Sequence, residues 1–277
     1  MTAATLASGK GHRDENFPVA SRLISPRHRA PIMAFYRFAR AADDIADHPS
    51  AAERDKLLGL KAMAEGLVGQ RDDEPTALAL REALREHGLE PRHALDLIAA
   101  FTQDVTKLRY ADWDDLIDYC RLSAMPVGRF VLDVHGESRA TWPMSDALCA
   151  ALQVINHLQD CAKDHRELDR VYIPADALAA TGASIEDLDK PAATAALRQT
   201  IIDLAQRTSL LLDEAEGFSR AIADRRLGVE VAVIQALARD LVARLRTRDP
   251  LSERVHHGKL EALAIAAPAA ARRALQR

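Results

Sequence analysis

"FARAADDIADHP", residues Phe38–Pro49, has the pattern of a helix and yet carries three aspartates within five positions: Asp43, Asp44 and Asp47. Aspartate is a poor helix former, and like charges one turn apart on a helix repel each other. A helix that gathers these residues indicates a cation close to them. The stretch therefore predicts a helical scaffold with a cationic ligand.

The composition of the 277-residue chain favours helices throughout. Hydrophobic residues make up 48% and aromatic residues only 4%, and no alternation of apolar and polar residues persists long enough for a sheet. We expect an all-α fold with a single domain over residues 1–277, because no shift in composition marks a linker. This length predicts helices around a shared central cavity rather than a simple four-helix bundle.

Charge and cysteine content exclude several classes of function. A formal net charge of -4 leaves no basic excess to neutralise phosphates, so we expect no nucleic-acid partner. The three cysteines are odd in number and lack the spacing of a zinc site, which favours a reducing cytoplasm. No segment has the length and apolarity of a membrane span, and the start of the chain has no signal-peptide core.

The last stretch, "LEALAIAAPAAARRALQR" (residues 260–277), has two interpretations. The pattern favours a packed or frayed terminal helix. The alternative is a helix that lies on a membrane surface, since leucines and arginines occur together in it.

Prolines and glycines divide the chain into helices of globular length. Pro31 suits the first turn of a helix that ends near His48, because Pro49 follows. Further helices are predicted at residues 51–69, 75–88, 91–108, 112–136, 145–165 and 227–246, with a pair of helices across 191–224.

Two of these helices each carry a polar stripe on one face. At about 100° per residue, a narrow arc of the first helix contains Tyr36, Arg40, Asp43 and Asp47. We call this set the first stripe. The second stripe, on the helix of residues 145–165, contains Gln153, Asn156, Asp160 and Asp164. Apolar neighbours flank both stripes, so we expect the carboxylates to be partly enclosed.

Together the two stripes predict a magnesium site. Mg²⁺ prefers oxygen ligands and is usually held by one or two carboxylates together with substrate phosphates. Arg40 suits a phosphate oxygen, which makes a diphosphate the implied ligand. The alternative is a solvated acidic surface, which a single stripe would favour. Two enclosed stripes favour the metal, because unpaired carboxylates are costly to bury without a cation.

The helix of residues 112–136 contains a further candidate region. Pro126 removes a backbone hydrogen bond and predicts a kink, and Gly128 allows another group to approach closely. Tyr119 precedes this kink. Helix packing alone would explain the same pattern.

Several aromatic and histidine residues are interpreted as structural on the sequence alone. Tyr172 is typical of a core residue whose hydroxyl is satisfied. His157 fits a satisfied interior histidine better than a metal ligand. His256 and His257 are interpreted as surface residues, because adjacent helical residues point apart.

Three stretches together resemble the squalene and phytoene synthase family of trans-isoprenoid diphosphate enzymes. They are "FYRFARAADDIADHP" (35–49), "YCRLSAMPVGRF" (119–130) and "ALQVINHLQDCAKDHRELDRVYIP" (151–174), in the family's order and spacing. The resemblance covers the core from about Asn16 to Pro174. The stretches "DENFPVASRLISP" (14–26), "NHLQDCAKD" (156–164) and "DPLSERV" (249–255) look most like the branch that forms hydroxysqualene in bacterial hopanoid synthesis.

This resemblance implies an isoprenoid synthase fold with an apolar channel and Mg²⁺ at its mouth. Asp43 and Asp47 match the first aspartate-rich motif of the family, and Asp160 and Asp164 the second, all as metal ligands. The implied catalytic residues are Tyr36, Arg40, Tyr119 and Tyr172. The implied substrate-binding residues are Phe17, Arg40, Gly128, Gln153 and Asn156.

The resemblance also implies a reaction, in which presqualene diphosphate and water give hydroxysqualene and pyrophosphate. Gln159 stands where many relatives carry arginine, and Cys161 and Lys163 replace small and acidic residues, which favours this branch over a two-step synthase. The closest alternative is condensation of two farnesyl diphosphates to presqualene diphosphate; the other is a non-catalytic helical scaffold. The implied partners are a prenyl diphosphate lipid, a presqualene diphosphate synthase, and a membrane contacted peripherally from its cytoplasmic face.

Overall fold

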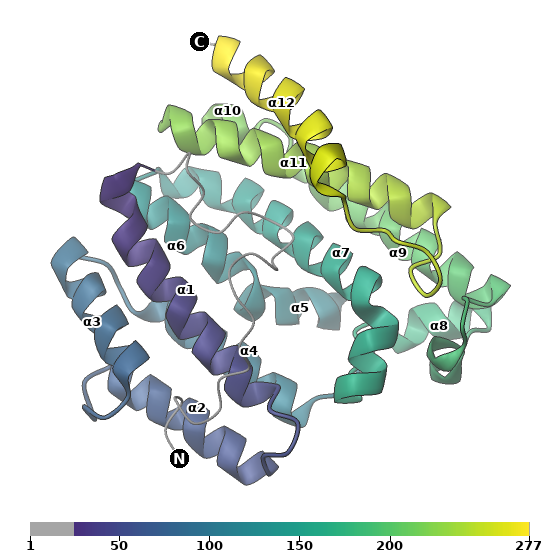
Figure 1. The fold of residues 1–277 in the computed structure, drawn as a ribbon, viewed down its shortest axis with the longest axis horizontal. Helices are drawn as coiled ribbons and strands as arrows, with labels where there is room; N and C mark the ends of the chain where they lie inside the picture. Colours follow the sequence, from purple (N-terminus) through teal and green to yellow (C-terminus); the bar gives the residue numbers. More distant parts are fainter. Residues whose placement is uncertain (1–24, 277) are drawn as a thin grey trace. The chain divides into compact units, whose positions relative to one another are not determined.

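The computed structural model describes residues 25–276, which form helices joined by loops (Figure 1). The α-helices are α1 Pro26–Ala46, α2 Glu53–Leu67, α3 Pro75–His87, α4 Arg92–Thr106, α5 Trp113–Ser123, α6 Met125–His135, α7 Trp142–Leu168, α8 Ala175–Thr181, α9 Ala195–Glu214, α10 Phe218–Ala221, α11 Arg225–Thr247 and α12 Lys259–Leu275. Two 3-10 helices, η2 Arg139–Thr141 and η3 Ile185–Asp189, complete them. Within this described range the only β pairing is a single bridge between Arg109 and Val171, so the all-α prediction is confirmed.

Two compact units make up the chain. The first contains Met1–Lys107 and Pro126–Ser138, and the second contains Leu108–Met125 and Arg139–Arg277. The expectation of one domain around a central cavity stays a prediction.

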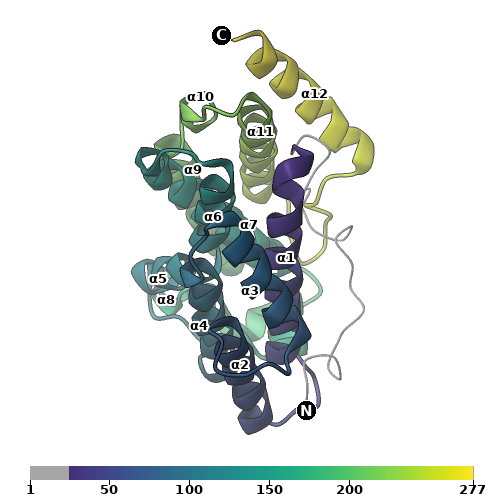
Figure 2. The ribbon, with the colours of Figure 1, turned by 90° about the vertical axis from the view of Figure 1, so that its left-hand side faces the viewer.

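In the first unit, α1 packs against α2, α3 and α4 (Figure 2). Its inward side chains Phe38 and Ile45 are fully buried, and the Phe35 ring stacks on Phe130 of α6 with centroids 4.0 Å apart. Gly59 of α2 permits the close approach to α1, because a Cβ there would lie 3.2 Å from Ile45 Cγ2. The hydrophobic core thus fixes which face of α1 remains for polar groups.

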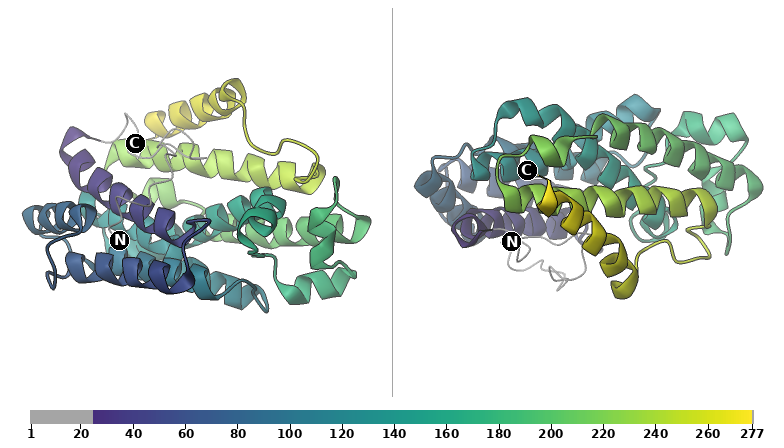
Figure 3. Two further views of the ribbon diagram at one scale, coloured as in Figure 1. Left: turned by 60° about the horizontal axis from the view of Figure 1, so that its bottom comes forward. Right: turned by 90° about the horizontal axis from the view of Figure 1, so that it is seen from above.

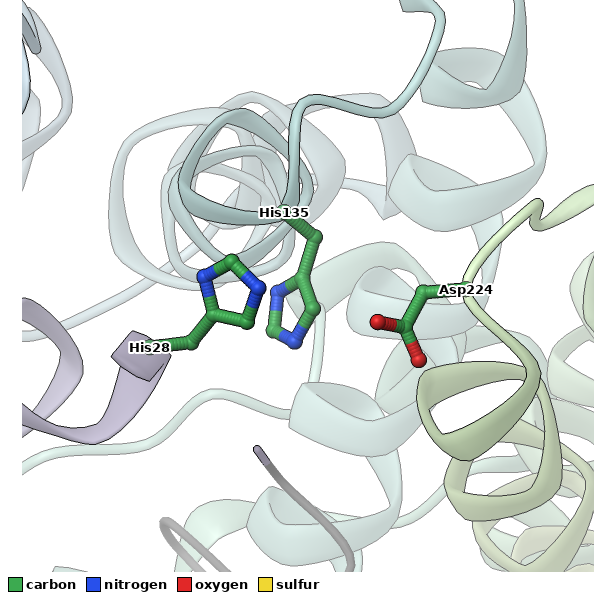
Figure 4. Close-up of side chains that lie close together, drawn as sticks. All are labelled: His28, His135 and Asp224. Atoms are coloured by element: carbon green, nitrogen blue, oxygen red, sulfur yellow. The ribbon is translucent and has the colours of Figure 1, made fainter. Parts of the chain in front are cut away.

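Helix α1 begins earlier than the sequence pattern predicted. Pro26 occupies its first turn, and Pro31 lies inside the helix rather than at its start. Pro31 lacks the N–H that would donate to the Arg27 carbonyl, so one backbone hydrogen bond is missing near the start of α1. The extra residues bring His28 against His135 of α6, with ring centroids 4.2 Å apart (Figure 4). Asp224, also labelled in Figure 4, belongs to the second unit, where it caps α11.

In the second unit, α7 packs against α5, α9 and α11, and α12 lies along α11 (Figure 3). Side-chain caps begin three of its helices: Asp112 accepts from the Asp115 N–H, Thr194 from the Leu197 N–H, and Asp224 from the Arg226 and Leu227 N–H groups. Such caps satisfy donors that a helix start leaves unpaired. The terminal helix predicted from the last stretch is confirmed as α12.

The helix predicted across residues 112–136 is two helices. Helix α5 ends at Ser123 and α6 begins at Met125, with Ala124 between them. Pro126 therefore lies in the first turn of α6, where its missing N–H is not needed. The predicted kink is a break between two helices.

None of the helices within residues 25–276 has both the length and the apolarity needed to cross a bilayer.

Candidate metal and diphosphate site

The first stripe lies on the half-buried face of α1, as predicted. Tyr36, Arg40, Asp43 and Asp47 are all half-buried. The Asp47 N–H donates to the Asp43 carbonyl at 2.9 Å as the helix ends, so the two carboxylates stand one turn apart. Enclosure of these groups by the apolar flanks is confirmed.

Arg40 is occupied by carboxylates in this structure. Its Nη1 lies 2.9 Å from Asp43 Oδ2, and its Nη2 lies 3.2 Å from Asp44 Oδ1. Asp44, which was set outside the stripe, thus belongs to the same charged cluster. A phosphate oxygen would have to share this guanidinium with the two carboxylates or displace one of them.

The acidic cluster on α1 is short of positive charge. Burial, followed by the neighbouring Asp47 carboxylate, raises the pKa of Asp43 to about 7, and Arg40 only partly opposes this. Asp44 and Asp104 also raise the pKa of Asp43. Asp104 lies on α4 and is 4% exposed. Sequence reasoning missed it, although a buried-face aspartate in an otherwise apolar helix is a detectable signal.

Desolvated carboxylates of this kind fit a divalent cation. Carboxylate oxygens that lie one helical turn apart and are partly removed from water are the type of donor that Mg²⁺ takes in proteins. A bound cation would relieve the repulsion that raises the Asp43 pKa. The chemistry of the residues present therefore agrees with the predicted metal.

The second stripe lies on the half-buried face of α7. Gln153, Asn156, Asp160 and Asp164 are all half-buried, at the spacing expected. Burial, followed by Asp164, raises the pKa of Asp160. The repulsion between aspartates seen on α1 is thus repeated on α7.

Two residues near the second stripe differ from their sequence interpretation. His256 lies with its Nε2 3.9 Å from Asp160 Oδ1, so it borders the site rather than an unrelated surface. No spacing motif links residue 256 to residue 160, so their proximity could not be predicted from the residue pattern. Gln159 is only 6% exposed and lies on the buried side of α7, away from the stripe.

Four aromatic side chains form a buried cluster in the second unit, which we call the aromatic cluster. Its members are Tyr110, Tyr119, His157 and Tyr172, each less than 8% exposed. The Tyr172 ring lies 5.4 Å from the centroids of both Tyr110 and Tyr119. The interpretation of Tyr172 as a buried core residue is confirmed, and its neighbours are the other tyrosines of this unit.

The backbone explains how Tyr110 and Tyr172 meet. Two extended segments pair through Val171 N–H to Leu108 O and Ala175 N–H to Tyr110 O, both at 2.9 Å. Asp169 ends α7 in the left-handed region with φ 52°, which turns the chain toward this pairing. Tyr110 was not singled out by sequence, because its partners lie far along the chain.

His157 connects the aromatic cluster to the second stripe. Its ring stacks on Tyr172 with centroids 3.5 Å apart. Its Nε2 lies 3.1 Å from Gln153 Nε2, and its Nδ1 lies 4.0 Å from Asp164 Oδ2. If Gln153 donates, Nδ1 carries the imidazole proton and faces the Asp164 carboxylate. The interpretation of His157 as a satisfied interior histidine is confirmed.

The other predicted site residues lie in both units of the structure. Tyr36 lies on the same half-buried face of α1 as Arg40 and the aspartates, while the rings of Tyr119 and Tyr172 meet in the second unit. Gly128 lies half-buried in the first half of α6. Phe17 lies outside the described residues. The sharing of one ligand by both stripes stays a prediction.

An all-helical fold with two carboxylate stripes and an aromatic cluster defines the class of helical enzymes that process prenyl diphosphates. The family model described as squalene/phytoene synthase matches residues 11–261. A hydroxysqualene synthase of Zymomonas mobilis is 58% identical over 99% of this chain and 93% of its own length. One of Rhodopseudomonas palustris is also 58% identical, over 94% of this chain and 90% of its own.

A solved structure agrees with these relatives. The crystal structure of squalene synthase HpnC from Alicyclobacillus acidocaldarius superposes with a TM-score of 0.74 at 30% identity, over 88% of this chain and 91% of that one. The chain belongs to the squalene/phytoene synthase family.

Proposed function

We propose that this protein is a hydroxysqualene synthase, which converts presqualene diphosphate and water into hydroxysqualene and pyrophosphate. The observation that carries the proposal is the 58% identity to two hydroxysqualene synthases over nearly the whole chain. The structure supports it with two half-buried carboxylate stripes of the kind that a metal and diphosphate require.

In the proposed reaction, the carbon–oxygen bond to the diphosphate breaks and pyrophosphate leaves with the electron pair. A water molecule adds its oxygen to the rearranged carbocation and then releases a proton. Asp43, Asp47, Asp160 and Asp164 would hold Mg²⁺, which supplies Lewis-acid stabilisation of the leaving group when bound. Arg40 would bind a diphosphate oxygen in exchange for one of its carboxylates.

The other proposed residues act on the isoprenoid part of the substrate. Tyr119 and Tyr172 would stabilise the carbocation through their ring faces and exclude water until the rearrangement is complete. Tyr36 would line the same chamber from α1. Gln153 and Asn156 would bind the diphosphate end, with Phe17 and Gly128 along the channel. These roles follow the match to the family and the half-buried or buried positions of the described residues.

The test is product analysis with purified protein. Presqualene diphosphate and Mg²⁺, without NADPH, should give hydroxysqualene by mass spectrometry and an equal amount of pyrophosphate. Farnesyl diphosphate supplied alone should give no presqualene diphosphate. The opposite pattern would identify a condensing synthase instead.

A binding measurement distinguishes the proposed enzyme from a scaffold without activity. Presqualene diphosphate should raise the melting temperature of the protein only when Mg²⁺ is present, because ligands that bind the folded state stabilise it. A scaffold would show no such stabilisation.

We also propose that the enzyme works in the cytoplasm at the inner face of the membrane, coupled to a synthase that supplies presqualene diphosphate.

A further inference from the structure

Helix α12 has an unusual outward face. Eight of its exposed positions are apolar and fall within one side of the helix: Leu260, Leu263, Ala264, Ala267, Pro268, Ala271, Ala274 and Leu275. The exposed Lys259, Glu261 and Arg272 lie outside this apolar arc. Leu260, Leu263 and Leu275 are 82%, 62% and 84% exposed, more than any other large hydrophobic side chain among residues 25–276. The solvent face of a surface helix normally carries charged and polar residues.

Polar contacts hold α12 so that this face points away from the protein. Near its end, Arg273 is buried and its Nε donates to the Ser219 carbonyl at 2.9 Å, while Arg225 Nη2 donates to the Ala274 carbonyl at 3.2 Å. At its start, Arg244 Nη1 lies 3.3 Å from Glu261 Oε2. Polar contacts therefore hold the helix near both ends, and they fix the direction of its apolar face.

Two exposed basic residues, Lys259 and Arg272, and one exposed acidic residue, Glu261, lie at the edges of the apolar face. The sequence from residue 254 to the end of the chain has one acidic residue, Glu261, against five basic residues: Arg254, Lys259, Arg272, Arg273 and Arg277. This concentration occurs in a chain whose formal net charge is -4. An apolar helix face edged by basic residues is complementary to a bilayer that contains anionic lipids.

We propose that the outer face of α12 docks the protein onto an anionic lipid bilayer, with its leucines among the acyl chains and its basic residues among the headgroups. The choice of a bilayer over a protein partner rests in part on the proposed function, whose substrate is a long isoprenoid dissolved in membranes. Docking would hold the enzyme where this substrate is concentrated.

The test is co-sedimentation of the full-length protein with vesicles, in the absence of substrate. Vesicles that contain phosphatidylglycerol should bind the protein, and pure phosphatidylcholine vesicles should bind it less. The double variant Leu260→Gln/Leu263→Gln should bind about tenfold or more weakly. The matched control is Leu58→Gln/Leu210→Gln, which removes two exposed leucines from α2 and α9 and should bind as the wild type does. Arg272→Gln should weaken binding chiefly at low salt.

Three outcomes would overturn the proposal. They are equal binding by both double variants, no preference for anionic vesicles, or a dimer in solution that the α12 variant alone converts to a monomer. Turnover of detergent-dispersed presqualene diphosphate is measured separately. It should be unchanged in the α12 variant, so that failed docking and failed hydroxysqualene synthesis give different results.

Discussion

The imidazole of His157 lies face to face with the phenol of Tyr172, with ring centroids 3.5 Å apart and planes 16° from parallel. The same imidazole touches Gln153 and faces Asp164. One side chain of α7 therefore contacts an amide of the second stripe and a tyrosine of the aromatic cluster, and it lies 4.0 Å from a carboxylate of the same stripe. Groups that orient a metal ligand commonly tune metal affinity, although they do not touch the metal.

His157→Phe should separate these two roles. Phenylalanine preserves the ring that stacks on Tyr172 but removes both ring nitrogens, so Asp164 loses its imidazole neighbour. We expect the Mg²⁺ concentration for half-maximal pyrophosphate release to rise about tenfold to a hundredfold, while the melting temperature in EDTA changes little. His87→Phe, at an exposed site on α3, is the control. An unchanged Mg²⁺ dependence would restrict His157 to packing.

Loss of a stripe carboxylate should be far more damaging than loss of a surface carboxylate. Asp43→Asn and Asp160→Asn each remove a charge from the predicted metal site while retaining the shape of the side chain. We expect each to lower pyrophosphate release at least about a hundredfold. Asp203→Asn is the matched control, because Asp203 is exposed on α9 and contacts only the amide of Gln199 among the bonds described. Substantial turnover by either stripe variant would contradict the metal assignment.

The two stripes were predictable because each depends only on residues that lie close together in the sequence. Spacings of three, four, seven and eleven residues place side chains on one helix face, and only the helical period is needed to see it. Tyr110 and His256 were missed for the opposite reason, because each meets its partners through packing of segments that lie far apart in the sequence. Asp104 differs, because an aspartate on the apolar face of α4 is a local signal. The start of α1 was misjudged because Pro26 and Pro31 both suit a first turn, and only the packing of His28 against His135 distinguishes them.

The stability of the metal-free protein should depend on the ionisation of Asp43. Burial and the Asp47 carboxylate raise the Asp43 pKa from 3.8 to about 7 in the folded protein, so between these pH values the folded state holds a proton that the unfolded chain has released. The free energy of unfolding should therefore fall as pH rises through this window. Melting curves in EDTA would show this, and Asp43→Asn should flatten the dependence.

Mg²⁺ should oppose this loss of stability at higher pH. Mg²⁺ binds the ionised carboxylate, so its stabilising effect should be larger at about pH 8 than at about pH 5.5. Melting curves with and without Mg²⁺ at the two pH values make the comparison. Equal stabilisation at both values would mean that Asp43 is not a ligand.

Gly228→Ala should lower the stability of the protein, whereas replacing a helical glycine by alanine usually raises it. Alanine ordinarily stabilises a helix interior by about 1 kcal/mol relative to glycine. A Cβ on residue 228 of α11, however, would lie 2.9 Å from Arg273 Nη2 and 2.9 Å from the Ser219 carbonyl. Since the Ser219 contact is to a backbone oxygen, moving a side chain cannot relieve the strain. Arg273 would also be displaced from its hydrogen bond with the Ser219 carbonyl.

We expect a net destabilisation of about 1–3 kcal/mol, measured by denaturant unfolding, together with faster proteolysis within α12. Gly59→Ala on α2 provides the comparison, because a Cβ there would approach only side-chain atoms, with Ile45 Cγ2 nearest at 3.2 Å and no backbone atom as close as the Ser219 carbonyl is to residue 228. Its effect should be smaller and should leave α12 as resistant as in the wild type. A Gly228→Ala protein that is as stable as the wild type would show that α12 is not anchored through Arg273, and the fixed orientation of its apolar face would lose its main support.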